Sequence, residues 1–355
     1  MSKIKIALIG AGNIANAHLR SYQSVGDAEI YAICDINEQR LNETADRFGI
    51  ERRYTDVDTM LAALPELDAA DVCVWNCNHA ACAIKALNAG LHVLCEKPMA
   101  YNTEQAAQML EAARRNNRLL MIGFVCRFEK ESKIAMDFIN KGYLGDIYYS
   151  KVLFTRRHGN PGGWFADKSR SGGGPVIDLG VHVIDLVRWL MGNPRPVSVY
   201  AVTYDKIGKR DYLKNAVDYS PKGASAEEPS TVEDFASAMI RYDNGAVTYL
   251  ETSYSLNGPD EYRQELFGTK GGIDISDGVK LYTECNDYLS DISVSTKNYK
   301  GVTGTDFEEE MAHFVDCVKN GTTCIAPAED GYQIMRILDA IYESARTVHE
   351  VLLSE

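Results

Sequence analysis

The sequence predicts an α/β protein, with a doubly wound parallel sheet at the N-terminus followed by an α+β domain with a large, open, mostly antiparallel sheet. Three observations lead to this fold class. Short apolar β-like runs alternate with helical patterns in the first third of the chain, which is typical of a sheet with helices on both faces. A glycine-rich loop follows the first run, and long strands separated by turn sequences fill much of the second part. We expect two domains, 1–125 and 126–355, with the C-terminal helix able to pack back on the first.

The first domain contains five expected strands with helices between them. The strands are short and apolar because both faces of a parallel sheet are buried. They are expected at Ile4–Ile9, Glu29–Cys34, Asp71–Trp75, Leu91–Cys95 and Leu119–Gly123. Helices are expected at Asn13–Ser24, Asn37–Phe48 and Thr103–Asn116, with an alanine-rich helix between the third and fourth strands.

The second domain is expected to pair its strands mainly as hairpins. Asp243-Asn244-Gly245 is a strong turn signal, since Asn-Gly accepts positive φ at both turn positions. The expected strands are Asp146–Thr155, Pro196–Tyr204, Val232–Tyr242, Ala246–Tyr254 and Glu261–Phe267. The expected helices are Lys130–Asn140, Pro175–Leu190, Asp306–Asn320 and Ala328–Leu353. The polar segment Lys206–Pro229 has no clear period, and we interpret it as a long excursion or lid.

Composition excludes several classes of partner. The net charge is −13, and a strongly acidic chain is repelled by nucleic acid and by anionic lipid. The nine cysteines are odd in number and scattered, which favours reduced thiols in a cytoplasmic protein. The group Cys73, Cys77, His79 and Cys82 lacks the ligand spacing of zinc sites, so we expect no metal.

The glycine-rich loop has the form of a dinucleotide-binding fingerprint. It reads Gly10-Ala11-Gly12-Asn13-Ile14-Ala15 and lies between the first strand and the first helix. Gly10 permits a tight turn, Gly12 lets the backbone approach a pyrophosphate, and Ala15 allows close packing of helix on strand. We therefore expect Gly10, Gly12, Asn13 and Ile14 to bind the cofactor in a Rossmann domain.

The end of the second strand bears on which cofactor is bound. Asp35 can accept hydrogen bonds from the hydroxyls of the adenosine ribose, and its carboxylate repels a 2′-phosphate. Ile36 offers no guanidinium for such a phosphate, whereas the nearby Arg40, also a candidate cofactor contact, keeps NADP open. We expect NAD rather than NADP.

Two further motifs carry candidate chemistry. Glu96-Lys97-Pro98 ends a strand at the carboxyl edge of the sheet, where ligands of such folds bind; the alternative is a solvated surface pair. In the helix expected after Gly172-Gly173-Gly174-Pro175, Asp178 and His182 stand four residues apart on one face. Such a pair suits general base chemistry, although structural histidine–carboxylate pairs are also common.

Together these three motifs, in this order, resemble the Gfo/Idh/MocA oxidoreductases over nearly the whole chain. The resemblance implies a Rossmann domain, then an open-faced sheet that mediates homodimers or homotetramers. It implies that Lys97 is the catalytic lysine, also contacting substrate, that Lys97-Pro98 is cis, and that Glu96 touches the nicotinamide ribose. It also implies that Asp178 and His182 bind substrate and handle its proton.

The resemblance extends to the loops that flank these motifs. Asn76-Cys77-Asn78-His79 takes the place of a loop beside the cofactor, although Asn76 and Cys77 depart from the family's Thr-Pro pattern and Ala81 stands where some relatives have histidine. Arg127 matches an arginine placed near the nicotinamide.

A basic, tryptophan-containing stretch resembles the substrate loop of sugar and glycoside dehydrogenases in the family. An indole can stack on a pyranose, and arginines can bind its hydroxyls. The alternative is a solvent-facing basic loop beside a core tryptophan. The expected substrate contacts in this loop are Arg156, Arg157, His158 and Trp164.

The sequence thus predicts NAD-dependent hydride transfer at a ring carbon of a sugar, glycoside or inositol, with His182 or Lys97 as the base. One alternative is a redox-neutral enzyme that oxidises a sugar transiently, eliminates a glycosidic group and reduces the product. A second alternative is a regulator that binds NAD without catalysis, although such proteins tend to lose the lysine or the histidine.

Overall fold

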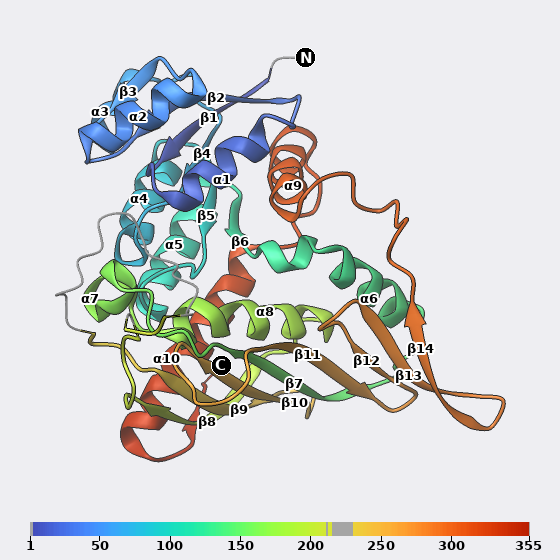
Figure 1. Ribbon diagram of the computed structural model, residues 1–355. Helices are drawn as coiled ribbons and strands as arrows, with labels where there is room; N and C mark the ends of the chain where they lie inside the picture. The colour runs from blue at the N-terminus through green and yellow to red at the C-terminus, as the bar shows by residue number, and fades with distance from the viewer. Residues whose placement is uncertain (1–2, 211, 215–229, 355) are drawn as a thin grey trace. The chain divides into compact units, whose positions relative to one another are not determined.

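The computed structural model describes residues 3–210, 212–214 and 230–354 (Figure 1). The chain forms two compact units. The first comprises Met1–Val125 and Thr303–Met335, and the second comprises Cys126–Val302 and Arg336–Glu355. Part of the expected lid, residues 215–229, lies outside the described residues.

The first unit contains a parallel sheet of six strands in the order β3-β2-β1-β4-β5-β6. Their register brings the carboxyl ends together, because Ile9 pairs with both Cys34 and Val72, and Val72 pairs with Cys95. Any side chain that follows one of these strands therefore lies at the same edge. The strands are β1 (Ile4–Ile9), β2 (Ala28–Cys34), β3 (Arg52–Tyr54), β4 (Ala69–Val72), β5 (His92–Glu96) and β6 (Leu120–Gly123).

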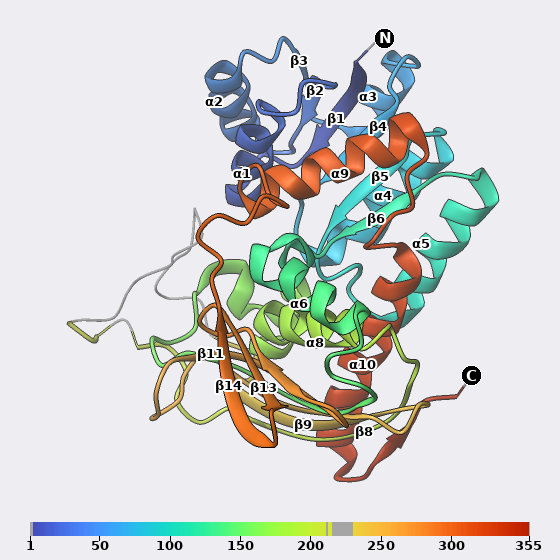
Figure 2. The same cartoon turned by 90° about the vertical axis from the view of Figure 1, so that its right-hand side faces the viewer.

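Helices pack on both faces of this sheet. α1 packs against α9, which crosses the sheet in Figure 2, and α4 packs against α5. Side chains cap several of these helices; Asn102, for example, accepts a hydrogen bond from Gln105 N–H. The helices are α1 (Asn13–Tyr22), α2 (Glu38–Phe48), α3 (Val57–Ala63), α4 (Asn76–Asn88), α5 (Thr103–Asn116), α9 (Asp306–Asn320) and the first part of α10 (Ala328–Thr347).

The second unit is built on a mixed, mostly antiparallel sheet of nine strands, ordered β14-β13-β12-β11-β7-β10-β9-β8-β15. β7 and β10 are its parallel pair. The strands are β7 (Ile147–Thr155), β8 (Pro196–Tyr204), β9 (Phe235–Tyr242), β10 (Val247–Ser253), β11 (Glu261–Gly268), β12 (Gly272–Asp274), β13 (Val279–Cys285), β14 (Tyr288–Val294) and β15 (Val351–Leu352). Its helical elements are η1 (Val125–Phe128), α6 (Lys130–Asn140), η2 (Gly163–Ala166), α7 (Lys168–Ser171), η3 (Val176–Gly180), α8 (Val181–Leu190) and the second part of α10.

The fold class predicted from the sequence is confirmed, with local corrections. The last helix ends at Thr347 rather than Leu353, because the chain turns back and Val351 pairs with Val199 in the sheet. At the β9–β10 hairpin only Gly245 has positive φ, so Asn244 does not adopt the expected left-handed conformation. The short elements β3 and α3 and the strands β12 to β14 were not predicted. Across the described ranges, every helix is too short or too polar to span a bilayer.

Candidate active site

The first unit places four of the predicted site segments at one edge of its sheet. Gly10, Asp35, Asn76 and Glu96 lie at or just beyond the carboxyl ends of β1, β2, β4 and β5. In an open parallel sheet this edge is where ligands bind.

The loop between β1 and α1 fits the pyrophosphate of a dinucleotide. Gly10 has φ +102°, and a Cβ there would lie 2.3 Å from the carbonyl oxygen of Cys73, so only glycine fits. At Gly12 a Cβ would meet nothing within 4 Å, and no side chain caps the N-terminus of α1. The loop therefore leaves helix amides and open space where a phosphate would be bound.

Asp35 is already rich in donors within the chain. Its carboxylate accepts hydrogen bonds from the N–H groups of Ala11 and Asn37, each at 2.8 Å. Arg40 donates to both oxygens, from Nε at 3.1 Å and from Nη2 at 2.7 Å. This bidentate pairing neutralises the guanidinium of Arg40, the group that had kept binding of NADP and its 2′-phosphate as an alternative. The hydrogen bond from Ala11 N–H holds Asp35 against the glycine-rich loop.

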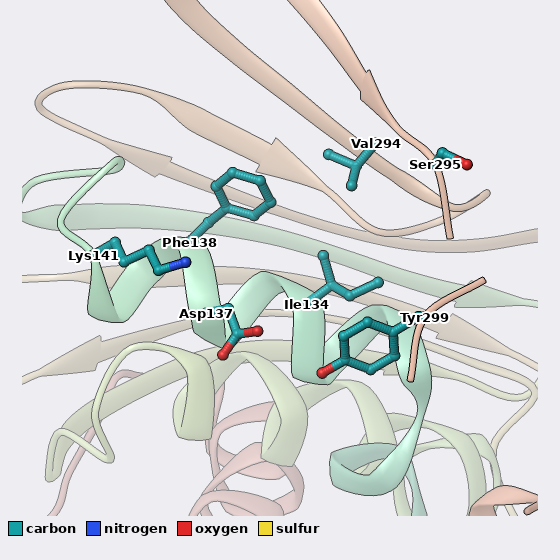
Figure 3. A pocket seen from close by; sticks show the side chains of 7 residues that line it. All are labelled: Ile134, Asp137, Phe138, Lys141, Val294, Ser295 and Tyr299. Atoms are coloured by element: carbon teal, nitrogen blue, oxygen red, sulfur yellow. The ribbon is translucent and has the colours of Figure 1, made fainter. Parts of the chain in front are cut away.

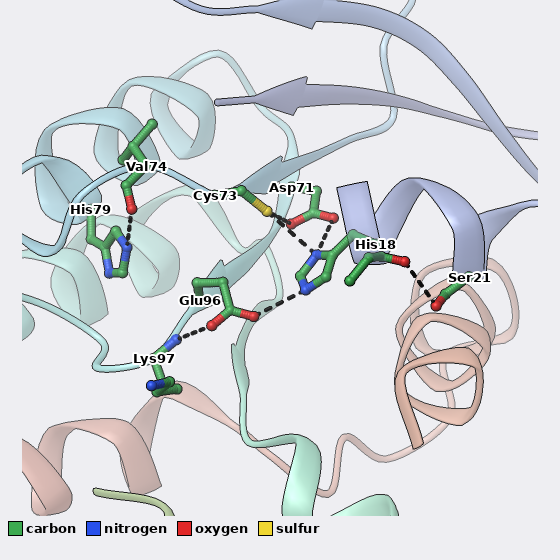
Figure 4. A network of polar contacts seen from close by, with 9 residues as sticks. His18, Ser21, Asp71, Cys73, Val74, His79, Glu96 and Lys97 are labelled. Carbon is green, nitrogen blue, oxygen red and sulfur yellow. Dashed lines mark hydrogen bonds and ion pairs between the residues drawn. The ribbon is translucent and has the colours of Figure 1, made fainter. Parts of the chain in front are cut away.

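A buried polar network lies behind the Glu96-Lys97 segment (Figure 4). His18, on α1, is fully buried; its Nδ1 lies 2.8 Å from Asp71 Oδ2 and its Nε2 lies 3.0 Å from Glu96 Oε1. The other oxygen of Glu96 accepts a hydrogen bond from Lys97 N–H at 3.1 Å. One imidazole thus connects the first helix to the backbone of the predicted catalytic lysine.

The charges in this network follow from the contacts. Burial would lower the pKa of His18, but the charge of Asp71 and its hydrogen bond outweigh burial and raise the pKa well above its ordinary value. Burial would raise the pKa of Glu96, yet its hydrogen bond and charge interaction with His18 lower it. We therefore describe the network as an imidazolium between two carboxylates.

His79 and the asparagines of its loop lie at the start of α4. His79 is buried, with Nδ1 2.7 Å from the carbonyl oxygen of Pro98 and Nε2 3.1 Å from that of Val74. Through these contacts His79 supports the segment that contains the Lys97–Pro98 peptide bond. This bond is cis, as predicted. Asn76 is buried and Asn78 is exposed, and their contacts with a cofactor stay predictions.

In the second unit, Asp178 and His182 lie on a helix whose first turn is unusual. Val176–Gly180 forms a π-turn before the α-helix begins at Val181, where the sequence predicted one continuous α-helix. Single π-turns occur frequently at functional sites. Both side chains are half-buried. Asp178 Oδ2 accepts a hydrogen bond from Tyr254 at 3.0 Å, and His182 Nδ1 lies 3.6 Å from Cys126 Sγ.

The glycines before this helix make room for other side chains of the chain itself. A Cβ at Gly173 would lie 1.9 Å from the Tyr342 hydroxyl, and one at Gly174 would lie 2.5 Å from the Glu233 carbonyl oxygen. The Glu233 carboxylate accepts hydrogen bonds from the N–H groups of Gly174 and Val176 and from Tyr342. Glu233 thereby occupies the amides at the start of the helix.

Arg127 belongs to the packing of the second unit. Its side chain is fully buried and donates to both oxygens of Asp185, from Nε at 2.9 Å and from Nη2 at 2.5 Å. A buried bidentate pair of this kind holds η1 to α8. The predicted contact of Arg127 with the nicotinamide stays a prediction.

The basic loop after β7 is partly fixed by its neighbours. Arg156 lies over the ring of Phe154, and His158 Nε2 lies 3.5 Å from Asp260. Arg157 is exposed, whereas Trp164 is half-buried and lies against Phe165. The loop thus offers polar groups at its surface, and its substrate contacts stay predictions.

A separate pocket of the second unit lies between α6 and the segment that follows β14 (Figure 3). Apolar side chains such as Ile134, Phe138 and Val294 line it, with Asp137 and Lys141. None of the predicted site residues lines this pocket, so we do not assign the active site to it.

Sequence reasoning missed the partners that hold the predicted residues. They come from distant segments, so no local spacing identifies them. The only signal was indirect, since a run of three glycines implies close approach of some other part of the chain. The missed residues are His18, Asp71, Cys126, Glu233, Tyr254 and Tyr342.

Comparison with known families decides the class. Residues 4–124 match the model of an oxidoreductase family with an NAD-binding Rossmann fold, and residues 137–353 match that family's C-terminal α/β domain. This chain belongs to the Gfo/Idh/MocA oxidoreductase family. The predicted family and the predicted NAD cofactor are therefore confirmed.

Several characterised relatives span the whole chain. The chain is 32% identical to D-glucoside 3-dehydrogenase of Escherichia coli, covering 98% of this chain and 96% of the relative. It is 27% identical to myo-inositol 2-dehydrogenase of Thermotoga maritima, covering 99% of each. A solved structure of levoglucosan dehydrogenase with NADH and levoglucosan superposes with a TM-score of 0.86 at 25% identity, covering 100% of both chains.

Proposed function

We propose that this protein is an NAD-dependent dehydrogenase that transfers a hydride between nicotinamide and a ring carbon of a glycoside, sugar or inositol. The observation that carries the proposal is the shared sheet edge, where a loop suited to a pyrophosphate lies beside the buried support of Glu96 and Lys97. The names of the relatives support the substrate class, and the 32% identical glucoside dehydrogenase favours a glycoside.

The chain's own groups divide the work of binding. The amides at the start of α1 bind the pyrophosphate, and Asp35, held by Arg40, receives the adenosine ribose. Asn13, Ile14 and the Asn76–His79 loop flank this position in the proposal. When bound, NAD supplies the hydride acceptor.

Three residues share proton transfer and substrate orientation in this proposal. Oxidation of an alcohol needs a base for the hydroxyl proton, and we assign Lys97 or His182 to this task. Asp178 orients the substrate, its own position fixed by the hydrogen bond from Tyr254. The polar groups of Arg156, Arg157 and His158, with the indole of Trp164, bind the rest of the sugar in this proposal.

His18 acts as a positioning residue in this scheme. It holds Glu96, and Glu96 holds the backbone of Lys97, so the imidazolium fixes the segment without touching the substrate. Its charge also keeps Glu96 ionised despite burial.

The test is an NAD⁺ reduction screen over glucosides, free hexoses, inositols and levoglucosan. We expect NADH to accumulate with a glycoside or inositol, together with one keto product whose position NMR identifies. Failure of the whole panel would contradict the proposal. Glycoside cleavage without net NADH would instead assign the redox-neutral cycle, and NAD binding without turnover would assign a regulator.

The proposal includes assembly through the large sheet. The side chains of Tyr200, Tyr204 and Met239 are exposed on the neighbouring strands β8 and β9. Tyr200 pairs with Met239 in the sheet, and Tyr204 stacks with Phe235. Exposed apolar surface of this kind is typical of interfaces. We expect a homodimer or homotetramer by light scattering, and Met239→Asp should shift it toward monomer; a monomeric wild type would contradict this part.

A cytoplasmic location completes the proposal. Cys34, Cys73 and Cys95 are buried reduced thiols, which is typical of proteins in reducing compartments.

A further inference from the structure

A cluster of three potential metal ligands lies at the C-terminal end of α9, apart from the residues proposed for hydride transfer. His313 and Cys317 stand one helical turn apart, and Cys324 follows in the segment after the helix. The ligating atoms of the three side chains all lie within 4.8 Å of one another. Cys317 is buried, while His313 and Cys324 are half-buried, so small ions can reach the cluster.

The chain fixes the turn that brings Cys324 back over the helix. Gly321 ends α9 in the left-handed conformation, with φ 72°. The Asn320 amide and the Thr322 hydroxyl then donate to the carboxylate of Asp316, at 2.6 and 2.5 Å. Ile325 N–H donates to His313 Nε2 at 3.1 Å. The cluster is therefore held together before any ligand arrives.

One pair of these atoms already has the separation of ligands in a tetrahedral site. With Zn–S near 2.3 Å and Zn–N near 2.0–2.1 Å, neighbouring sulfur and nitrogen ligands are about 3.5 Å apart. Cys317 Sγ lies 3.4 Å from His313 Nε2, and the three ligating atoms all lie within 4.8 Å of one another. A cation is also favoured electrostatically here, because the C-terminal end of a helix has partial negative charge.

We propose that His313, Cys317 and Cys324 bind a borderline-soft divalent cation of the Zn²⁺ type. His313 Nε2 and the two sulfur atoms are the protein ligands, and water completes the tetrahedron. Binding releases the thiol protons of Cys317 and Cys324, because the thiolate is the form that binds metal. It also exchanges the hydrogen bond from Ile325 N–H for a bond from His313 Nε2 to the metal. The ion would hold the segment between α9 and α10, which contains Cys324, to the C-terminal end of α9.

The test titrates Co²⁺ into the full chain after removal of metal by a chelator. We expect one Co²⁺ per chain, with the thiolate-to-cobalt charge-transfer band and the visible bands of tetrahedral cobalt, both lost when Zn²⁺ displaces it. Cys324→Ser should weaken binding by more than the roughly 10–100-fold effect of losing an outer-shell partner. Cys82→Ser, a thiol of similar burial, should bind as wild type does.

A second measurement keeps the test independent of folding defects. Zn²⁺ should raise the Tm of wild type and of Cys82→Ser but not that of Cys324→Ser. No charge-transfer band in wild type, or an equal band in Cys324→Ser, would overturn the site. A third result would also overturn the site. If peroxide forms a Cys317–Cys324 disulfide at the same rate with and without excess Zn²⁺, the ion does not bind these two sulfur atoms.

Discussion

Two glycine-rich segments lead into helices, one in each unit, and they serve opposite purposes. Before α1, Gly12 has open space around it and no side chain caps the helix. Before η3, the glycines admit Tyr342 and Glu233, and the carboxylate of Glu233 takes the first amides. Glycine creates room in both places. In the first unit the room suits a ligand, whereas in the second the protein fills it.

The largest expected effect is a loss of turnover on replacing Lys97, which lies at the same sheet edge as the glycine-rich loop before α1. Lys97→Ala should lower kcat by roughly two to four decades, the usual contribution of an acid–base group. NAD affinity, measured by fluorescence titration, should remain close to wild type because the glycine loop is untouched. Nearly full turnover would remove Lys97 from the mechanism.

His18→Leu should cost about 3–5 kcal/mol of unfolding free energy, because it leaves Asp71 and Glu96 buried without their shared cation. His18→Gln keeps a donor and should fold better. Since the charge of His18 lowers the pKa of Glu96, the acidic limb of the kcat/KM profile should move to higher pH in His18→Gln. If the acidic limb of the kcat/KM profile did not move, His18 would contribute only to packing.

Gly173→Ala tests the second glycine segment. The added methyl would overlap the Tyr342 hydroxyl, so we expect a loss of about 1–3 kcal/mol or more in urea unfolding. Tyr342→Phe in the same chain removes the nearest atom and should recover part of that loss. If Gly173→Ala were as stable as wild type, the glycine segment before η3 would have as much open space as the loop before α1.

Gly12→Ala is the matched substitution in the first unit. Nothing within 4 Å obstructs its methyl group, so the Tm should change little. The methyl would lie where we expect the pyrophosphate, and NAD should bind at least about tenfold more weakly, about 1.4 kcal/mol. Unchanged affinity would mean that the open space does not receive the cofactor.

The smallest effect is expected at Glu310, on α9. Both carboxylate oxygens are buried without a partner among the described residues, and burial raises the pKa well above its ordinary value. The folded state therefore binds this proton more tightly than the unfolded state, and stability falls as pH rises toward the folded pKa. Glu310→Gln should abolish that loss, while changing stability little below the ordinary carboxyl pKa, where the side chain is protonated in both states. Thermal melts across pH would show this, and an unchanged profile would place the ionisation elsewhere.

Much of the first unit could be predicted because its signals are local. Gly10, Gly12 and Asp35 follow strands whose apolar runs are plain in the sequence. The support of Glu96 and Asp178 could not be predicted, because it comes from distant parts of the chain. His18 contacts Glu96 across 78 positions, and Tyr254 contacts Asp178 across 76. The strands β13 and β14 were missed for another reason: their exposed faces carry mixed polarity, which weakens the alternation that identifies a strand.

The central claim is direct hydride transfer from substrate carbon to NAD. The decisive measurement uses the glycoside or inositol that the screen identifies, labelled with deuterium at the oxidised carbon, and follows NADH by mass spectrometry. We predict one deuterium in each NADH formed, in step with the keto product. Unlabelled NADH, or product formed while the label stays in the sugar, would contradict the account.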